Sequence, residues 1–327
     1  MAEKDILVKV ENLKMYFPVD KTLLGKVTSY VKAVDDVSFE VERGKTFGLV
    51  GESGCGKTTT GKCVLRINTP TDGHIYYKGK DISHASKSEL APIRREIQLI
   101  FQDPYGSLDP RQSAYSIIKE AIVTDGKPHT REEIDKRVNE LLATVEMIPE
   151  MGERYPHEMS GGQRQRLGIA RALACNPEFI VCDEPISALD VSIQAQVINT
   201  LESLQEKLGL SYLFVSHDLS MVRHISHNVG VMYLGCMVER APVQELYSNM
   251  LHPYTQALMS AVPIPDPDMA AASQRIHLTG DVPTPIDPPS GCRFRARCPY
   301  ATEQCAQERP ELREVAPDHF VACHRIK

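Results

Sequence analysis

Apolar and polar residues alternate in two stretches near the N-terminus, at residues 6–10 and 37–41. Alternation with a period of two is typical of strands with one buried face, so both stretches are predicted to join an antiparallel sheet. Residues 18–31 between them are expected to form a loop or hairpin. A short apolar strand is predicted over residues 46–50, and a helix over residues 57–65.

The pattern changes to helical spacing over residues 113–150. Thr130 and Glu133 stand three positions apart and fit a capping box, which predicts a helix that begins there. Apolar residues at positions 134, 138, 141, 142 and 145 then share one helical face. We expect a helical subdomain at about residues 103–165.

Apolar strands return at residues 179–182 and 212–215, with a helical stretch at residues 192–208 between them. Alternation of strand, helix and strand predicts a parallel sheet. The fold is therefore expected to be α/β, with an antiparallel β subdomain and the helical subdomain attached.

The last part of the chain has a different composition. Seven prolines fall within residues 263–289, a density that stops helix and sheet and favours an extended linker. A small cysteine-rich segment follows. We predict a main domain over residues 1–255 and a C-terminal extension, linker included, over residues 256–327.

Composition excludes several classes of protein. The chain has 327 residues, of which 42% are apolar and 24% charged, as in an ordinary soluble globular protein. No run approaches the roughly 18 apolar residues that cross a bilayer, and the first residues lack a signal-peptide layout, so we expect a cytosolic protein. The net charge of −6 gives no reason to expect a nucleic-acid partner.

A glycine-rich loop links the strand at residues 46–50 to the helix after it. In this setting backbone N–H groups converge on phosphates, Lys57 reaches the β and γ phosphates, and the Thr58 hydroxyl can coordinate Mg²⁺. The loop predicts a nucleoside triphosphate site. Its residues, with the next threonine included, are Gly51, Glu52, Ser53, Gly54, Cys55, Gly56, Lys57, Thr58 and Thr59.

Two acidic residues follow the strand at residues 179–182. Asp183 stands at the strand end, where a carboxylate can hold Mg²⁺. Glu184 is then placed to act as a general base on the attacking water.

A second glycine-rich helix start lies about a hundred residues after the phosphate loop. Ser160 fits an N-cap, and Gly161 and Gly162 before Gln163 permit close approach of another group to the backbone. The helix that follows would direct the positive end of its dipole at a phosphate.

Together these motifs resemble the ATP-binding subunit of ABC transporters over residues 6–255. The resemblance implies a P-loop NTPase core of the ABC ATPase type, with ATP and Mg²⁺ as cofactors. Beyond the phosphate loop, the motifs are the Gln102 loop at residues 99–103, the signature Ser160-Gly161-Gly162-Gln163, the strand that ends in Asp183-Glu184, the loop Ser187-Ala188-Leu189-Asp190, and His217 after a strand.

The resemblance also implies roles. Gln102 would contact Mg²⁺ and the attacking water, and His217 would contact the γ phosphate and hold the water and Glu184 in line. The signature would bind ATP on the opposite subunit, which makes the protein a dimer, and Asp190 belongs to the nucleotide-binding set. An aromatic residue is expected to stack on adenine; Tyr16 and Phe17 both fit, and Phe17 is favoured.

Four cysteines fall in the last 36 residues, with five, six and seventeen residues between successive members: Cys292, Cys298, Cys305 and Cys323. Four ligands match a [4Fe–4S] or tetrahedral metal site, although the spacing is not that of a zinc ribbon. Reduced, unligated thiols are the alternative. This segment resembles the C-terminal extension of oligopeptide and dipeptide importer ATPases, some of which hold an iron–sulfur cluster there. Residues 155–158 and 252–255 also resemble stretches of that family.

We therefore expect the ATP-hydrolysing subunit of a di- or oligopeptide importer, peripheral on the cytoplasmic face of the membrane. The implied partners are a second ATP-binding subunit, identical or paralogous, two membrane-spanning permease subunits and, indirectly, an extracytoplasmic solute-binding protein. Nickel or an oligosaccharide is an alternative cargo. A soluble ABC-type ATPase that acts on nucleic acid or ribosomes, and a redox-sensing role for the terminal region, are the alternatives from other classes.

Overall fold

The structure is a computed structural model that describes residues 4–20, 27–124, 126–187, 189–262, 275–280, 283–288 and 290–326. The chain divides into two compact units. Unit 1 comprises residues 1–41, 46–84 and 216–327, and unit 2 comprises residues 42–45 and 85–215. Across the described ranges, no helix has both the length and the apolar character that a bilayer crossing requires.

Unit 1 begins with an antiparallel sheet in the strand order β2-β1-β4-β5. Val8 of β1 pairs with Tyr77 of β4, and both side chains are buried. The two strands predicted here are confirmed, and each extends beyond its alternating stretch. The bounds are β1 Ile6–Pro18, β2 Tyr30–Glu42, β4 Asp72–Tyr77 and β5 Lys80–Asp81.

Backbone hydrogen bonds join the ends of β1 and β2. The N–H of Val19 donates to Ser29, and the N–H of Thr28 donates to Asp20. This pairing agrees with the predicted hairpin, whose residues 21–26 lie outside the described residues.

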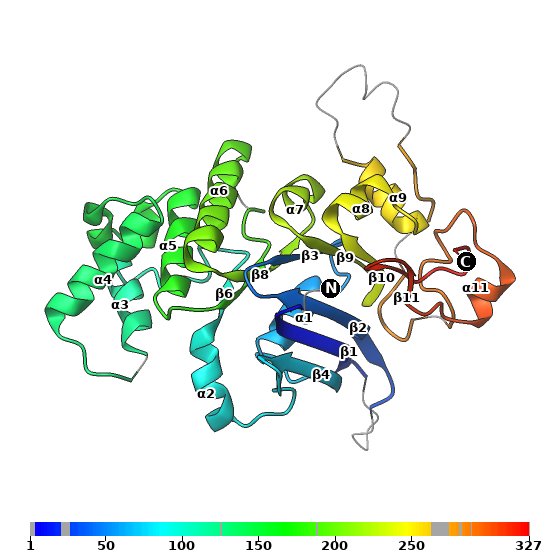
Figure 1. Cartoon of the computed structure of the whole chain (residues 1–327), viewed down its shortest axis with the longest axis horizontal. Coiled ribbons are helices and arrows are strands. Elements are labelled where there is room, and N and C mark those ends of the chain that lie inside the picture. The colour runs from blue at the N-terminus through cyan, green and yellow to red at the C-terminus, as the bar shows by residue number, and fades with distance from the viewer. Residues whose placement is uncertain are drawn as a thin grey trace. The chain divides into compact units, whose positions relative to one another are not determined.

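The second sheet of unit 1 has the strand order β11-β12-β10-β9-β3. β3 is parallel to β9, and the other neighbours are antiparallel. Val321 of β12 pairs with Glu239 of β10, so the C-terminal end of the chain extends this sheet (Figure 1). The bounds are β3 Thr46–Val50, β9 Asn228–Tyr233, β10 Cys236–Pro242, β11 Arg313–Ala316 and β12 His319–Val321.

Unit 1 also contains short helices. The predicted helix after the glycine-rich loop is confirmed as α1. The bounds are α1 Lys57–Val64, α7 Leu219–Ile225, α8 Val243–Ser248, α9 Pro253–Ser260 and α11 Glu303–Gln307.

Unit 2 contains three parallel strands in the order β8-β7-β6. Every residue of β7 and β8 is buried, as expected for strands covered on both faces. The predicted strand, helix and strand are confirmed as β7, α6 and β8. The bounds are β6 Ile97–Ile100, β7 Phe179–Asp183, α6 Val191–Leu208 and β8 Ser211–Ser216.

The remaining helices of unit 2 include those predicted for residues 113–150. The capping box of α4 is present: Thr130 accepts from the N–H of Glu133, and the Glu133 carboxylate accepts from the N–H of Thr130. The five apolar residues of its predicted face are buried. The bounds are α2 Lys87–Glu96, α3 Ala114–Val123, α4 Arg131–Thr144, η1 Pro149–Glu153, η2 Pro156–Glu158 and α5 Gly161–Leu173.

Much of the proline-rich stretch, residues 263–274, 281–282 and 289, lies outside the described residues. In its described part, Ile286 forms an isolated antiparallel bridge with Val31. The N–H of Lys32 donates to the carbonyl of Pro285. This part of the predicted linker therefore pairs with β2 of unit 1.

Candidate nucleotide-binding site

Unit 1 carries the phosphate loop between β3 and α1. Gly51, Gly54 and Gly56 adopt φ angles of 150°, 78° and 108°, which L-residues with a side chain rarely adopt. A Cβ on Gly56 would lie 2.1 Å from the carbonyl oxygen of Ala33. The loop can therefore keep this course only with glycine at position 56.

Lys57 folds back over the loop. Its side chain is buried, and its Nζ donates to the carbonyls of Gly51 at 2.8 Å and Glu52 at 3.1 Å. The loop thus holds a cation above the N-terminus of α1, where helix geometry favours anions.

The other loop residues differ in exposure. Ser53 and Gly54 are exposed, and Thr58 and Thr59 in the first turn of α1 are partly exposed. Cys55 points inward with 4% exposure, and burial raises the pKa of its thiol. Cys55 can therefore serve the site through its backbone, while its neutral thiol packs in the interior.

Glu52 has two side-chain neighbours that sequence reasoning missed. Its backbone N–H donates to Oη of Tyr254 at 2.9 Å, and its carboxylate accepts from Arg297 at 2.8 Å. Both partners belong to unit 1, more than 200 positions further along the chain. In the sequence, Tyr254 and Arg297 stood out only because residues 252–255 and the cysteine-rich segment carry a family resemblance, which predicted no role for either residue.

Unit 2 brings Gln102 and Glu184 together. Because β6 and β7 are parallel neighbours, with Ile100 opposite Cys182, the residues just after both strands meet at one edge. The Nε2 of Gln102 donates to the Glu184 carboxylate at 2.9 Å. Glu184 has a φ of 45°, and its N–H donates to the carbonyl of Val215.

Asp183 is the last residue of β7, and its side chain is buried. It precedes Glu184 at the same sheet edge, so unit 2 presents two carboxylates and the Gln102 amide there. The Gln102–Glu184 contact joins residues 82 positions apart, which sequence spacing alone does not reveal.

The signature begins α5 as predicted, with Ser160 as its N-cap. Ser160 accepts from the N–H of Gln163 at 3.3 Å, and the Gln163 side chain accepts from the N–H of Ser160 at 2.9 Å. This capping box went unnoticed in the sequence, although serine followed by glutamine three positions later is its signature. A Cβ on Gly162 would lie 2.6 Å from Cγ2 of Ile193, so the group that approaches Gly162 closely is a side chain of α6.

The remaining predicted residues lie near strand or helix ends. His217 is exposed, directly after β8, and belongs to unit 1. Asp190 is exposed at the N-cap position of α6, where its side chain makes no capping hydrogen bond. Ala188 of the same loop lies outside the described residues.

The two aromatic candidates for adenine occupy different environments. The Tyr16 hydroxyl donates to Asp35 at 2.5 Å. Burial raises the pKa of Tyr16, and this hydrogen bond raises it further. Phe17 is 37% exposed at the end of β1. Phe17 thus has the more accessible ring.

Cys292, Cys298, Cys305 and Cys323 all lie among the described residues, and none of the four forms a disulfide bond. Burial raises the pKa of Cys292 to about 11, and the nearby thiols of Cys305, Cys298 and Cys323 act in the same direction. Nevertheless, no group of three or more His, Cys, Asp or Glu among the described residues is arranged to hold a metal ion. The iron–sulfur expectation is therefore not supported by the structure.

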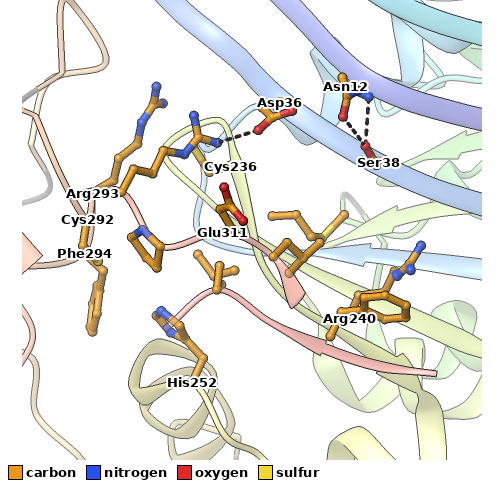
Figure 2. Close-up of a pocket in the computed structure, with 17 residues that line it drawn as sticks. Asn12, Asp36, Ser38, Cys236, Arg240, His252, Cys292, Arg293, Phe294 and Glu311 are labelled. Atoms are coloured by element: carbon orange, nitrogen blue, oxygen red, sulfur yellow. Dashed lines mark hydrogen bonds and ion pairs between the residues drawn. The ribbon is translucent and has the colours of Figure 1, made fainter. Parts of the chain in front are cut away.

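The C-terminal segment of unit 1 also lines a cavity of about 560 Å³. Figure 2 shows Cys292, Arg293 and Phe294 along one side of it and His252 below them. Burial lowers the pKa of His252 to about 3, so this imidazole stays neutral. Of the arginines at the cavity, Arg309 forms an ion pair with Asp36 at 3.8 Å.

Two family profiles match the chain. The one described as ABC transporter matches residues 34–187. The one described as Oligopeptide/dipeptide transporter, C-terminal region, matches residues 238–305. Each match falls on a part of the chain for which the sequence motifs had suggested the same resemblance.

Relatives match almost the whole chain. The oligopeptide transport ATP-binding protein AppF of Bacillus subtilis (strain 168) is 53% identical over 99% of this chain and 98% of its own length. The oligopeptide transport ATP-binding protein OppF of Escherichia coli (strain K12) is 47% identical over 99% of this chain and 97% of its own length. A solved dimeric ATP-binding cassette in a post-hydrolysis state, bound to ADP and phosphate, shares 27% identity and a TM-score of 0.65 over 72% of this chain and 98% of that chain.

Proposed function

The chain belongs to the family of ABC transporter ATP-binding proteins with the C-terminal region of oligopeptide/dipeptide transporters, and on that basis we propose that it hydrolyses ATP to power the import of di- or oligopeptides. The observation that carries the proposal is the 53% identity to an oligopeptide transport ATP-binding protein over 99% of the chain. The hydrogen bond between Gln102 and Glu184 supports the hydrolytic chemistry.

In unit 1, we assign the phosphate loop to the ATP phosphates. The positive φ angles of its glycines suit a loop whose N–H groups converge, and Lys57 supplies the cation. Phe17 is assigned to adenine, because the Tyr16 hydroxyl is engaged by Asp35. His217 is assigned to the γ phosphate.

In unit 2, Glu184 is assigned as the general base for the attacking water. A carboxylate in this role must be held in one orientation, and the amide of Gln102 at 2.9 Å supplies such a restraint. The test is Glu184→Gln, which keeps the shape and removes the base. It should retain ATP binding and lose at least about 99% of turnover; unchanged hydrolysis would refute the assignment.

The residues assigned to Mg²⁺ fit that ion. Thr58, Gln102 and Asp183 offer side-chain oxygens, which Mg²⁺ prefers, and Nε2 of Gln102 is the atom that contacts Glu184. Mg²⁺ would neutralise charge on the phosphates. Thr58→Ala and Asp183→Asn should each weaken the dependence of ATP binding on Mg²⁺ in an isothermal titration.

The signature is assigned to ATP on a second ATP-binding subunit, identical or paralogous. Support comes from its position at the N-terminus of α5, a helix of 13 residues, and Asp190 is assigned to the same interface. With ATP, Glu184→Gln should form a stable dimer in light scattering. A variant that binds ATP and remains a monomer would contradict a homodimer and direct the search to a paralogue.

The remaining partners are two membrane-spanning permease subunits and, indirectly, an extracytoplasmic solute-binding protein, with this chain peripheral on the cytoplasmic face. The test is uptake by the complete transporter in vesicles with ATP inside. Peptide uptake should require ATP and disappear with Glu184→Gln. Uptake of nickel or an oligosaccharide in place of peptide would contradict the cargo, and ATPase activity stimulated by RNA without permeases would contradict transport.

We also assign a [4Fe–4S] cluster to Cys292, Cys298, Cys305 and Cys323. The support comes from the sequence: four cysteines fall within 36 residues, in a segment that resembles one in which some family members hold such a cluster. Protein purified without oxygen should contain about four iron and four sulfide per chain and absorb broadly near 400 nm. Zinc instead of iron, or unligated thiols, would overturn the assignment.

A further inference from the structure

The segment from Cys292 to Cys298 contacts the rest of unit 1 at its core. The Phe294 ring is 1% exposed and packs against Tyr233, Tyr254 and His252, with ring centroids 5.2, 5.4 and 5.6 Å away. Figure 2 shows Phe294 and His252 on the same side of the cavity. This aromatic packing holds the segment in place and so determines where Arg297, three residues further on, can reach.

Arg297 reaches the phosphate loop. Its Nη1 donates to the Glu52 carboxylate at 2.8 Å, and the two side chains are 10% and 30% exposed. Its guanidinium also lies 6.0 Å from the centroid of the Tyr233 ring. A guanidinium stays protonated in proteins, so Arg297 places a permanent positive charge beside Glu52.

Glu52, the second residue of the loop, is held by several hydrogen bonds. Its carbonyl accepts from Nζ of Lys57 at 3.1 Å and from the N–H of Cys55 at 3.3 Å. Its N–H donates to Tyr254, which packs against Phe294. Tyr254 therefore holds the backbone of Glu52, and Arg297 holds its side chain.

The charge of Glu52 poses a problem for a loop assigned to a triphosphate. A carboxylate two residues into the loop repels an anion bound there, and this repulsion is weakly screened over a few ångströms. Arg297 donates a hydrogen bond to this carboxylate. The ion pair offsets this repulsion and restrains the residue whose carbonyl accepts from Lys57.

We propose that Arg297 is a positioning residue for ATP: from the C-terminal segment it neutralises and orients Glu52, and thereby makes the phosphate loop able to accept a triphosphate. This inference rests on the proposed ATP binding of the same loop. It makes residues 292–298 part of the nucleotide site, so their local order sets the affinity of this site for ATP.

The test compares four full-length proteins: wild type, Arg297→Met, Glu52→Gln and the double variant. The dissociation constant for MgATP is measured by titration with a fluorescent ATP analogue and ATP competition, and KM and kcat are measured separately. Arg297→Met should raise the dissociation constant and KM about fivefold, the low end of typical site-to-site coupling, with kcat changed less. The effect should shrink in 1 M salt, where the Debye length is about 3 Å.

The double variant separates electrostatics from folding. Because Glu52→Gln removes the charge that Arg297 neutralises, the double variant should bind MgATP within about twofold of wild type. Arg297→Lys, which keeps a cation, should also stay close to wild type. Arg295→Met is the matched control. Arg295 lies in the same segment and donates to the carbonyls of Ser290 and Ala306, which flank it, so its loss perturbs the segment without altering the charge beside Glu52.

Three results would overturn the inference. In the first, Arg297→Met binds MgATP as wild type does. In the second, the double variant is as weak as Arg297→Met, which would indicate loss of structure. In the third, Arg295→Met weakens binding equally. If wild type itself binds no MgATP, the proposed function fails as well, and that result is distinct from the other three. Should Arg297→Met fold poorly in a thermal melt, Arg297→Gln, which keeps a polar side chain without the charge, takes its place in the cycle and should weaken MgATP binding about fivefold.

Discussion

Asp35 of β2 links Arg293 and Arg309, near the C-terminus, to the N-terminal strands of unit 1. Its carboxylate accepts hydrogen bonds from Tyr16 at 2.5 Å, from Arg309 at 3.2 Å and from Arg293. The Asp35 and Arg293 side chains are 9% and 7% exposed. Replacing this carboxylate by Asn keeps the shape, removes the counter-ion that Asp35 gives to Arg293, and leaves Arg309 with its longer contact to Asp36 at 3.8 Å.

The magnitude follows from the burial of the pair. Breaking a buried ion pair by neutralising one member costs about 3–5 kcal/mol, because the other charge stays buried. The Asn oxygen still accepts one hydrogen bond, which places Asp35→Asn near the lower end. With an unfolding entropy of about 2.1 cal/mol/K per residue, a chain of 327 residues has about 0.7 kcal/mol/K in all, so a cost of about 3 kcal/mol should lower the melting temperature by about 4 °C.

The assay is thermal unfolding followed by circular dichroism, with Asp36→Asn as the matched control. Asp36 is half-exposed, and its contact with Arg309 is 3.8 Å, so its loss should change stability by less than about 1 kcal/mol. Equal melting temperatures for the two variants would refute the reasoning, since they would show that the Asp35 pairs contribute no more than a surface pair.

The pH dependence provides a second check on Asp35. Burial by itself would raise the pKa of its carboxyl, but the Tyr16 hydrogen bond and the charges of Arg293 and Arg309 together lower the pKa below the ordinary 3.8. A lowered pKa contributes stability that is complete above pH 3.8 and is lost as pH falls through the folded pKa. The stability gap between wild type and Asp35→Asn should therefore narrow below pH 3.8.

Three further comparisons test the site and its support. Gly162→Ala places a Cβ 2.6 Å from a side chain of α6, so a urea titration should show the free energy of unfolding lowered by about 1–3 kcal/mol. Gly161→Ala is the control: its Cβ would have its nearest contact at 3.3 Å, so the loss of stability should be smaller. Gln102→Ala removes the 2.9 Å hydrogen bond to Glu184; steady-state ATPase kinetics should show kcat reduced about tenfold or more, and an unaltered kcat would contradict its role. Thr130→Ala breaks the capping box of α4 and should cost about 1 kcal/mol in denaturant, without changing the KM for ATP.

The ABC ATPase fold expected from the sequence is confirmed by the likeness to a solved ATP-binding cassette. Local patterns were sufficient for this prediction. The alternation in β1, the apolar run of β7 and the capping box of α4 are short-range features that act over a few residues. The phosphate loop was recognisable for the same reason, since its glycines, Lys57 and Thr58 are consecutive in the chain.

Contacts between distant positions were harder to predict. Gln102 and Glu184 could be named as site residues, but their hydrogen bond depends on β6 and β7 being parallel neighbours. The cysteines illustrate a limit of another kind. Their spacing permitted an iron–sulfur cluster, and spacing alone does not tell how the thiols are arranged.

By itself, the sequence determined the identity of this protein as an ABC transporter ATP-binding subunit and the local conformation of its motifs, because consecutive residues set turns, caps and strand faces. Only the tertiary structure decided what surrounds those motifs. It placed Arg297 of the C-terminal segment 2.8 Å from Glu52 in the phosphate loop, across 245 positions of the chain. No periodicity or motif records such a contact, since it arises from the packing of Phe294 among Tyr233, Tyr254 and His252.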